Sequence, residues 1–176
     1  ADQAAVLERV QAWAASQMGP RIDRPLFING RQHMDIHPSV SVGFGARLEC
    51  IAEYNGVTYQ PKISIGAHTT AEFFLHIGAA QEVSIGADVM IAGHVSISDH
   101  AHLMKSDQPL HGQHLAVAPV RIGDSVFLGE YTFVKMGVTI GRHAIVGAHS
   151  VVTHNVPPYA TVAGAPARII RQGVED

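Results

Sequence analysis

Two histidines, His100 and His102, stand at the start of a polar stretch, residues 98–119, that is rich in His, Asp, Gln and Pro. An unperturbed imidazole has a pKa of about 6.5, so a histidine can take a proton from a substrate near neutral pH. The same two side chains could equally be solvated histidines of a surface loop. The pair is therefore a candidate for general-base chemistry, and the surrounding sequence must show what would hold it.

A six-residue repeat surrounds this stretch. From Ile122 to Pro157, a large apolar residue begins each hexad, and a smaller apolar or hydroxyl residue follows four positions later. The hexads begin at Ile122, Leu128, Val134, Ile140, Val146 and Val152, with partners at Val126, Thr132, Val138, Ala144, Ser150 and Val156. A strict period of six fits neither an isolated α-helix nor an alternating strand. It is typical of a β-helix, an all-β solenoid whose coils form a core only by stacking.

The repeat is predicted to extend back toward the N-terminus. Hexads are expected to begin at Ile36, Val42, Leu48, Ala67, Phe73, Ala79, Ile85, Ile91 and Ile97, with a loop at 53–62. In that register, His76 and His94 are 18 residues apart and should stack on adjacent coils, about 4.8 Å apart. From Ile97 to Ile122 is 25 residues, which is not a multiple of six. Residues 98–119 should therefore leave the coil, and such interruptions of a repeat usually carry the binding function.

The length of 176 residues suits one domain with a substantial core. We expect three parts: an N-terminal cap at 1–35, the β-helix at 36–163 and a C-terminal tail at 164–176. Within the cap, residues 2–18 have the apolar spacing of a short helix, and Asn29-Gly30 predicts a tight turn.

Composition narrows the function classes. A net charge of −3 gives no electrostatic reason to expect nucleic acid or an anionic membrane as partner. The single cysteine, Cys50, cannot form an internal disulfide, which suits a reducing compartment. The sequence contains no apolar run near the roughly 20 residues of a membrane span, and its start does not resemble a signal peptide. We therefore expect a cytoplasmic protein.

The hexads, the polar excursion and the ending VVTHNVPPYATVAGAPARII resemble the hexapeptide-repeat acyltransferases. In the ending, Pro157-Pro158, Gly164, Pro166 and Arg168 are the most specific residues. SISDHAH and APVRIGDSVFLGE are similar to the sugar O-acetyltransferases of bacterial capsule, O-antigen and colanic acid synthesis. The resemblance covers residues 36–171. It implies a left-handed parallel β-helix, a homotrimer with active sites between subunits, and acetyl-CoA as acetyl donor.

Acetyl transfer from a thioester to a hydroxyl requires a base and a donor for the developing oxyanion. Resemblance to galactoside and maltose acetyltransferases, whose catalytic histidine lies five residues past the last hexad start, implies His102 as the base. His100 is the second candidate. Either Asp99 or a backbone carbonyl could hold the imidazole in one tautomer.

The same resemblance assigns the acetyl-CoA site. It implies the backbone N–H of Glu130 as oxyanion donor, Gly129 as the residue that permits close approach, and Phe127 as a wall of the pocket. The remaining residues implied for the coenzyme are Gly147, Ala148, Thr153, His154, Arg168 and Arg171. The two arginines would meet the adenosine phosphates, although each could be an ordinary surface residue.

For the acceptor, the candidates are Glu72, His76, His94 and Asp99. Glu72 stands where galactoside acetyltransferases have an acceptor-binding asparagine, and Ala80 stands where they have an aspartate, so a different substrate is expected. His76 and His94 could instead form an ordinary ladder at a corner of the coil.

We therefore predict an acetyl-CoA-dependent sugar O-acetyltransferase in surface polysaccharide synthesis that needs no metal. Direct attack on the thioester fits, because Cys50 lies far from the excursion in sequence. Three alternatives remain open: an amino-sugar N-acetyltransferase on the same fold, a γ-carbonic-anhydrase-like zinc protein using His149 and His154, and a non-catalytic scaffold.

Overall fold

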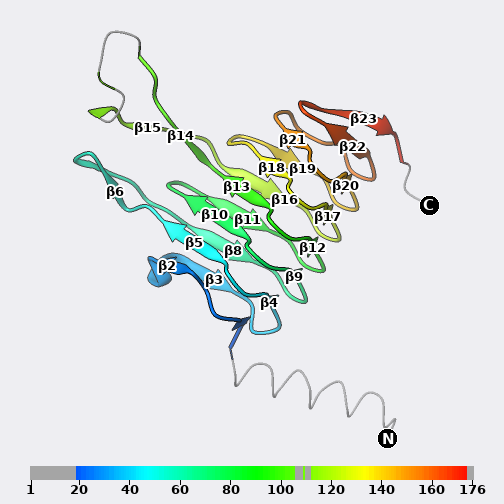
Figure 1. The fold of residues 1–176 in the computed structure, drawn as a ribbon, viewed down its shortest axis with the longest axis horizontal. Helices are drawn as coiled ribbons and strands as arrows, with labels where there is room; N and C mark the ends of the chain where they lie inside the picture. Colours follow the sequence, from blue (N-terminus) through cyan, green and yellow to red (C-terminus); the bar gives the residue numbers. More distant parts are fainter. Residues whose placement is uncertain (1–18, 106–108, 110–111, 174–176) are drawn as a thin grey trace, which may run out of the picture.

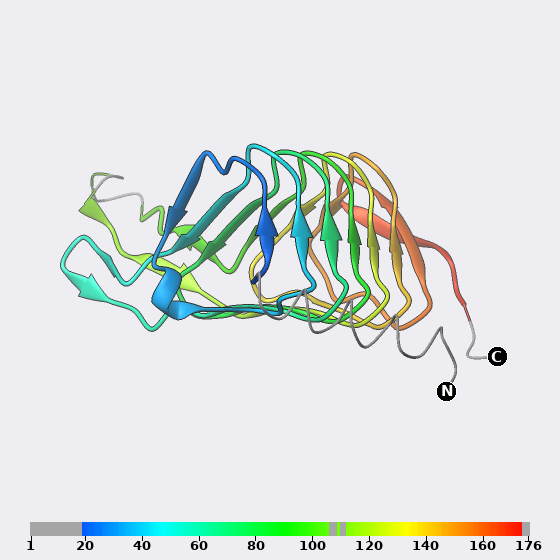
Figure 2. The same cartoon turned by 90° about the horizontal axis from the view of Figure 1, so that it is seen from below.

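The computed structural model describes residues 19–105, 109 and 112–173. These residues wind into a three-sided parallel β-helix, in which short strands of successive coils pair to form three sheets (Figures 1 and 2). Sheet A contains β1 (Arg21–Ile22), β4 (Ser41–Val42), β9 (Thr70–Ala71), β12 (Met90–Ile91), β17 (Phe127–Leu128), β20 (Ile145–Val146), β22 (Thr161–Gly164) and β23 (Ala167–Arg171). Sheet B contains β2 (Phe27–Asn29), β5 (Arg47–Cys50), β10 (His76–Ala79), β13 (Ser96–Ser98), β18 (Phe133–Val134) and β21 (Val151–Val152). Sheet C contains β3 (Met34–Ile36), β8 (Ile63–Ile65), β11 (Val83–Ile85), β16 (Val120–Ile122) and β19 (Thr139–Ile140).

The C-terminal coils follow the hexad pattern, as predicted. All twelve hexad positions from Ile122 to Val156 point inward and are at most 5% exposed. The two buried hydroxyls among them are satisfied, because Thr132 and Ser150 both donate to the backbone oxygen of Gly147. A six-residue step therefore carries the chain around each corner and returns an apolar residue to the core.

The register predicted for residues 67–79 is wrong. Ile65 and Ala71 occupy the inward positions in place of Ala67 and Phe73. The cause is a wider corner at Ala80–Glu82, which places eight residues rather than six between Ile77 and Ile85.

The predicted stacking of His76 on His94 is wrong for the same reason. His76 pairs with Ser96 in sheet B, and His94 lies at the corner between sheets A and B with φ of 59°. There the His94 ring stacks on Phe74 and Tyr131, at centroid distances of 4.9 and 4.6 Å.

One corner of the β-helix holds every departure from the six-residue step. Between aligned inward residues, the steps from sheet A to B and from sheet C to A are six residues in each coil. The steps from sheet B to C are 8, 17, 8 and 25 residues in the first four coils, at Ile28–Ile36, Leu48–Ile65, Ile77–Ile85 and Ile97–Ile122. In the fifth coil, from Val134 to Ile140, the step is again six. We call this edge the B–C corner.

Two of these insertions are antiparallel hairpins that project from the same edge (Figure 1). The excursion 98–119 leaves the coil, as predicted, and pairs β14 (His100–His102) with β15 (Leu115–Val117). The predicted loop at 53–62 contains β6 (Glu53–Tyr54) and β7 (Val57–Thr58), joined by Asn55-Gly56, both with positive φ.

The ends of the β-helix extend beyond the predicted bounds. Parallel pairing begins at Arg21, so the first coil lies within the expected cap, whereas the helix expected at 2–18 lies outside the described residues. The expected turn at Asn29-Gly30 is present: Gly30 has φ of 76° and begins the 3-10 turn η1 (Arg31–His33). At the other end, β23 folds back antiparallel on β22.

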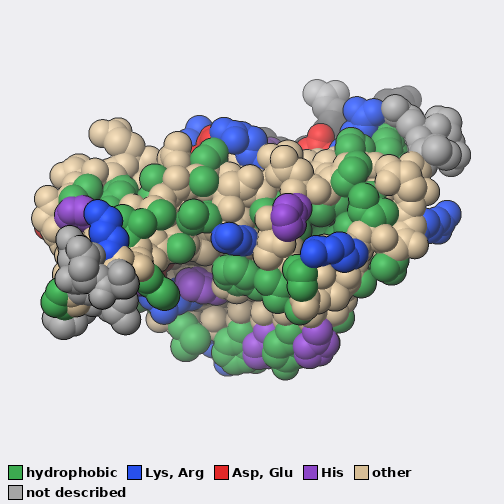
Figure 3. Space-filling model, turned by 90° about the horizontal axis from the view of Figure 1, so that it is seen from above, with side chains coloured by type: hydrophobic (Ala, Val, Ile, Leu, Met, Phe, Trp, Pro, Cys, Tyr) green, Lys and Arg blue, Asp and Glu red, His purple; other side chains and the backbone are tan. Residues whose placement is uncertain are grey.

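The surface is mixed in character. On the face that Figure 3 shows, Lys and Arg side chains are scattered among apolar and polar ones rather than gathered in one patch. Within the described residues, no helix has the length and apolarity needed to span a bilayer.

Candidate active site

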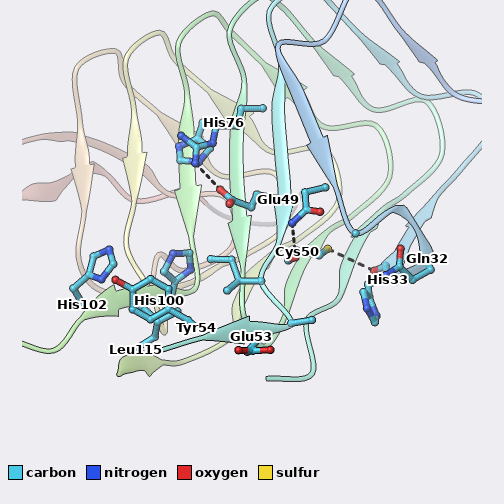
Figure 4. Close-up of a pocket in the computed structure, with 15 residues that line it drawn as sticks. Gln32, His33, Glu49, Cys50, Glu53, Tyr54, His76, His100, His102 and Leu115 are labelled. Carbon is cyan, nitrogen blue, oxygen red and sulfur yellow. Dashed lines mark hydrogen bonds and ion pairs between the residues drawn. The ribbon is translucent and has the colours of Figure 1, made fainter. Parts of the chain in front are cut away.

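The B–C corners of the first four coils enclose a pocket of about 530 Å³ (Figure 4). Its lining comes from every one of these coils: Asn29, Gly30, Gln32 and His33 from the first, Arg47 and Glu49–Tyr54 from the second, His76 from the third, and His100, His102 and Leu115 from the fourth. Figure 4 shows His100, His102, Tyr54 and Leu115 at one end, and Gln32 and His33 at the other. The pocket therefore runs along the axis of the β-helix.

His100 is held on one side and open on the other. Its Nδ1 lies 3.2 Å from Asp99 Oδ1 and 3.3 Å from Ser98 Oγ, and its side chain is 16% exposed. Within the described residues, Nε2 has no hydrogen-bond partner. A proton on Nδ1, facing the carboxylate, leaves the lone pair of Nε2 available as a base.

Asp99 is fixed beneath this imidazole. The residue is completely buried; Oδ1 accepts from the N–H of Ala80 at 2.8 Å, and Oδ2 accepts from the N–H of Gln81 at 2.7 Å. Both donors belong to the widened third corner, so the insertion that breaks the hexad register also seats the carboxylate. Because Asp99 is buried and does not line the pocket, its position suits an orienting group better than the acceptor contact expected from the sequence.

The ring of His100 also depends on a glycine of the neighbouring strand. A Cβ added to Gly78 would lie 2.9 Å from Cε1 of His100, so the imidazole occupies space that any side chain at this position would take. Gly78 aligns with Ser98 in the sheet, directly beside the histidine.

His102 lies in the same pocket but is held differently. Its side chain is exposed, and its ring packs against Tyr54 at a centroid distance of 5.3 Å, with no hydrogen bond to the described residues. The structure thus brings both candidate bases together, and only His100 has a polar contact that would fix its tautomer. The assignment of His102 as the base stays a prediction.

His76 is a further polar group of the pocket. Its Nδ1 lies 3.2 Å from Ser96 Oγ. Burial, and next the nearby Arg47 guanidinium, lower the pKa of His76, while Glu49 partly opposes them. The ring is therefore neutral at pH 7 and can serve as donor or acceptor to an uncharged ligand. Arg47 itself pairs with Glu49 at 2.7 Å.

Cys50 lies in this pocket, which the sequence analysis missed. The coil register brings it next to the first-coil turn, although it is far from the excursion in sequence. Burial, and secondly the charge of Asp99, raise the pKa of the thiol to about 11 against a backbone hydrogen bond from Ile63, and the residue is 2% exposed. A protonated, buried thiol is a poor nucleophile.

The residues expected to bind acetyl-CoA divide between two places. Gly129 and Glu130 form an A–B corner that stacks on the corner of Gly147 and Ala148; a Cβ on Gly129 would lie 2.6 Å from the nitrogen of Ala148. Phe127 is exposed on the outer face of sheet A.

The second place is the C-terminal end of the β-helix. Thr153 and His154 follow β21, with Thr153 Oγ1 2.9 Å from His154 Nδ1. His154 and Arg168 line a second pocket of about 510 Å³, and Arg171 is exposed at the end of β23.

Two other expected acceptor residues lie away from His76. Glu72 is at an A–B corner, where its Oε2 accepts from the N–H of Gly93 at 3.1 Å, and His94 stands in the aromatic ladder of that corner. The zinc alternative is not supported by its histidines, because His149 follows β20 at an A–B corner and His154 follows β21. Within the described residues, no group of three His, Cys, Asp or Glu side chains could hold a metal ion.

Comparison with known proteins bears on the whole chain. The family model described as bacterial transferase hexapeptide (six repeats) matches residues 119–154. The chain is 31% identical over 156 residues to a putative lipopolysaccharide biosynthesis O-acetyl transferase, WbbJ, of Escherichia coli K12, across 84% of this chain and 76% of that protein. The chain belongs to the hexapeptide-repeat acetyltransferase family.

Two other members of this family are similar. The galactoside O-acetyltransferase of Escherichia coli K12 is 36% identical over 115 residues, which span 65% of this chain but only 56% of that protein. A solved galactoside acetyltransferase in complex with coenzyme A superposes with a TM-score of 0.62 at 31% identity, over 81% of this chain and 66% of the other. The left-handed parallel β-helix predicted for a member of the family is confirmed.

Proposed function

We propose that this hexapeptide-repeat protein is an acetyl-CoA-dependent O-acetyltransferase that acetylates a sugar hydroxyl in surface polysaccharide synthesis. The observation that carries the proposal is the seat of His100, an imidazole oriented by a buried carboxylate at the end of a polar pocket. The relatives named as galactoside and lipopolysaccharide O-acetyltransferases support the sugar acceptor, and the relative bound to coenzyme A supports the donor.

His100 is the general base in this proposal, in place of His102. A base must keep one nitrogen free toward the substrate while the other is held, and His100 meets both conditions. His102, exposed on the hairpin and packed on Tyr54, is better suited to contact the acceptor.

The chemistry then proceeds in two proton transfers. Nε2 of His100 takes the proton of the acceptor hydroxyl as its oxygen attacks the thioester carbonyl, forming a C–O bond and a tetrahedral oxyanion. The N–H of Glu130 stabilises that oxyanion. When the C–S bond breaks, the imidazolium returns its proton to the coenzyme A thiolate, so the products are the acetyl ester and coenzyme A. Cys50 takes no part, because its thiol stays protonated.

A second copy of the chain completes the site. Glu130 lies at the A–B edge of sheet B and His100 at the opposite, B–C edge, so one chain does not bring the two groups together. A homotrimer with sites between subunits would pair the base of one chain with the Gly129–Glu130 and Gly147–Ala148 corners of another. Thr153, His154, Arg168 and Arg171 would then contact the coenzyme further along its length.

The test is a screen of free, nucleotide-linked and oligomeric sugars for coenzyme A release, with mass spectrometry of the product. We expect a mass gain of one acetyl group that mild base removes, as for an ester. A base-resistant acetyl group would identify an amide and favour the amino-sugar alternative. If no sugar is acetylated and acetyl-CoA does not bind by calorimetry, the proposed function is wrong.

A further inference from the structure

The outer face of sheet B presents two parallel rows of polar side chains. The aligned residues Arg47, His76 and Ser96 form one row, and Asn29, Glu49 and Ser98 form the other. Gly78 interrupts the second row, and the ring of His100 fills that space. Adjacent strands lie about 4.8 Å apart, so the distance from Asn29 to Ser98 is three strand spacings, roughly 14 Å. That is longer than one hexose.

The end of the pocket far from His100 is also built for polar contacts. Gln32 and His33 belong to η1, which begins at Gly30, and a Cβ on Gly30 would lie 2.6 Å from the Cβ of Cys50. The turn therefore packs directly on the second coil and forms a fixed ledge. Asn29 and Gln32 present amides and His33 an imidazole, side chains that can both donate to and accept from hydroxyl groups.

The charge of the pocket favours a neutral ligand over an anionic one. Arg47 is paired with Glu49, the pocket also holds Glu53, and His76 stays neutral at pH 7. A phosphate or carboxylate would meet no uncompensated cation here, whereas a chain of hydroxyl-bearing rings would meet amides, imidazoles and carboxylates along its length.

The wall beside His100 is fixed by contacts between the two hairpins. The Nδ2 of Asn55 donates to the backbone oxygen of Gln113 at 2.8 Å, and the hydroxyl of Tyr59 accepts from the N–H of Leu115 at 2.9 Å. Tyr54 packs on His102, so its ring lies in the pocket where a sugar ring could stack against it. The pocket is thus closed along one side from the second coil to the fourth.

We infer that this pocket is an extended groove for a neutral oligosaccharide, and that the distal ledge of Asn29, Gln32 and His33 is a subsite for a sugar unit beyond the one that is acetylated. The inference rests on the proposed function, since it takes His100 as the catalytic end of the groove. It narrows the acceptor to a chain of at least two sugar units.

The test compares acceptors of different length. The probes are glucose, galactose and N-acetylglucosamine oligomers of one to four units, assayed for kcat/KM with the wild type, with Asn29→Ala/Gln32→Ala, and with Gln172→Ala. Gln172, exposed beyond β23, provides a matched amide deletion away from the groove. Each lost hydrogen bond is worth about 1 kcal/mol, which corresponds to a roughly fivefold change.

For the wild type we expect the best tetramer to exceed its monomer at least about tenfold in kcat/KM. In the double variant this advantage should fall close to one, while kcat/KM for the monomer changes less than about twofold; Gln172→Ala should match the wild type. Equal efficiency for monomer and tetramer in the wild type, or equal losses for both in the double variant, would overturn the inference.

A second measurement separates this inference from the proposed function. Calorimetry of the same oligomers needs no acetyl transfer, and tetramer binding at least about tenfold tighter than monomer binding supports the groove even if the enzyme acetylates none of them. If acetylation occurs but affinity does not rise with chain length, the distal subsite is wrong and the proposed function stands. If the double variant does not fold, the wild-type length dependence alone decides.

Discussion

The first four coils and the last two of this β-helix share their core and differ at one corner. In both parts the inward positions are filled by apolar residues, and the steps at two of the three corners are six residues long. At the B–C corner, the first four coils insert a 3-10 turn, a hairpin, a widened turn and a longer hairpin, whereas the fifth coil inserts nothing. The candidate pocket lies along these four insertions.

This difference shows how a solenoid can acquire a site without disturbing its core. The coils bury their apolar residues with any length of corner, because the strands on either side keep their pairing. The extra residues then supply backbone donors, as at Ala80 and Gln81, or whole side-chain walls, as at Tyr54 and Leu115. Chemistry can therefore collect on one edge while the rest of the repeat stays regular.

The largest expected effect separates the two histidines of the fourth corner. His100→Ala should lower kcat by about 10²- to 10⁴-fold, because it removes the base. His102→Ala should lower kcat much less and act mainly on KM for the acceptor. Steady-state kinetics of both variants, with size-exclusion chromatography to check assembly, tests this. A severe kcat loss for His102→Ala with near-normal turnover for His100→Ala would restore His102 as the base.

The next largest effect contrasts two glycines, one from each part. In Gly78→Ala the new Cβ lies 2.9 Å from the His100 ring, a side chain that can move, so we expect kcat to fall about tenfold or more with little loss of stability. In Gly123→Ala the new Cβ lies 2.7 Å from the backbone nitrogen of Arg142. We expect that variant to lose about 1–3 kcal/mol of unfolding free energy.

Turnover per folded molecule and denaturant unfolding measure the two glycine variants together. Gly123→Ala should keep its activity where it remains folded. If Gly78→Ala lost stability rather than activity, the imidazole would not depend on the space above this glycine.

A smaller effect concerns the contact between the hairpins. Tyr59→Phe removes the acceptor of the Leu115 N–H, so hydrogen exchange at that amide should become faster, by about fivefold for 1 kcal/mol. Tyr159→Phe, which deletes a hydroxyl at a regular corner near Arg142, is the control. Unchanged exchange of the Leu115 amide in Tyr59→Phe would mean that the hairpins do not hold one another.

The smallest effect is a pH dependence of stability. Burial and Arg47 lower the pKa of His76, so between that value and the ordinary value of about 6.5 the unfolded chain binds a proton that the folded chain does not. The free energy of unfolding should therefore fall as pH drops below about 6.5, and His76→Gln should make this fall shallower. Denaturant unfolding from pH 5 to 8 measures it, with His143→Gln at a regular corner as control. Identical pH profiles for wild type and His76→Gln would contradict the effect of burial.

The same comparison explains what the sequence could predict. The hexads after Ile122 gave the correct register, because no insertion interrupts them, and the 25-residue gap before Ile122 identified the excursion. In the first part, insertions of two residues shift the phase without breaking the apolar pattern, so the hexads at Ala67 and Phe73 were misplaced. A better signal was available in ISIG, VSIG and VRIG, at 63–66, 83–86 and 120–123, which mark the sheet C strands and reveal the 20-residue coil.

The site was predictable only in part, for a physical reason. Residues close in sequence, such as Asp99 and His100, could be associated directly. The position of Cys50 and the seat of Asp99 on Ala80 and Gln81 depend on the coil register, which the hexad count had wrong. The assignments to the coenzyme stay predictions, since they concern a contact between copies of the chain.

The most direct measurement is a crystal structure of the protein with its acceptor sugar bound. We expect the sugar in the groove of the first four coils, with the reacting hydroxyl oxygen within about 3.2 Å of Nε2 of His100. A sugar bound at the regular corners of the last two coils, or with its reacting hydroxyl next to His102 and away from His100, would contradict the proposed site.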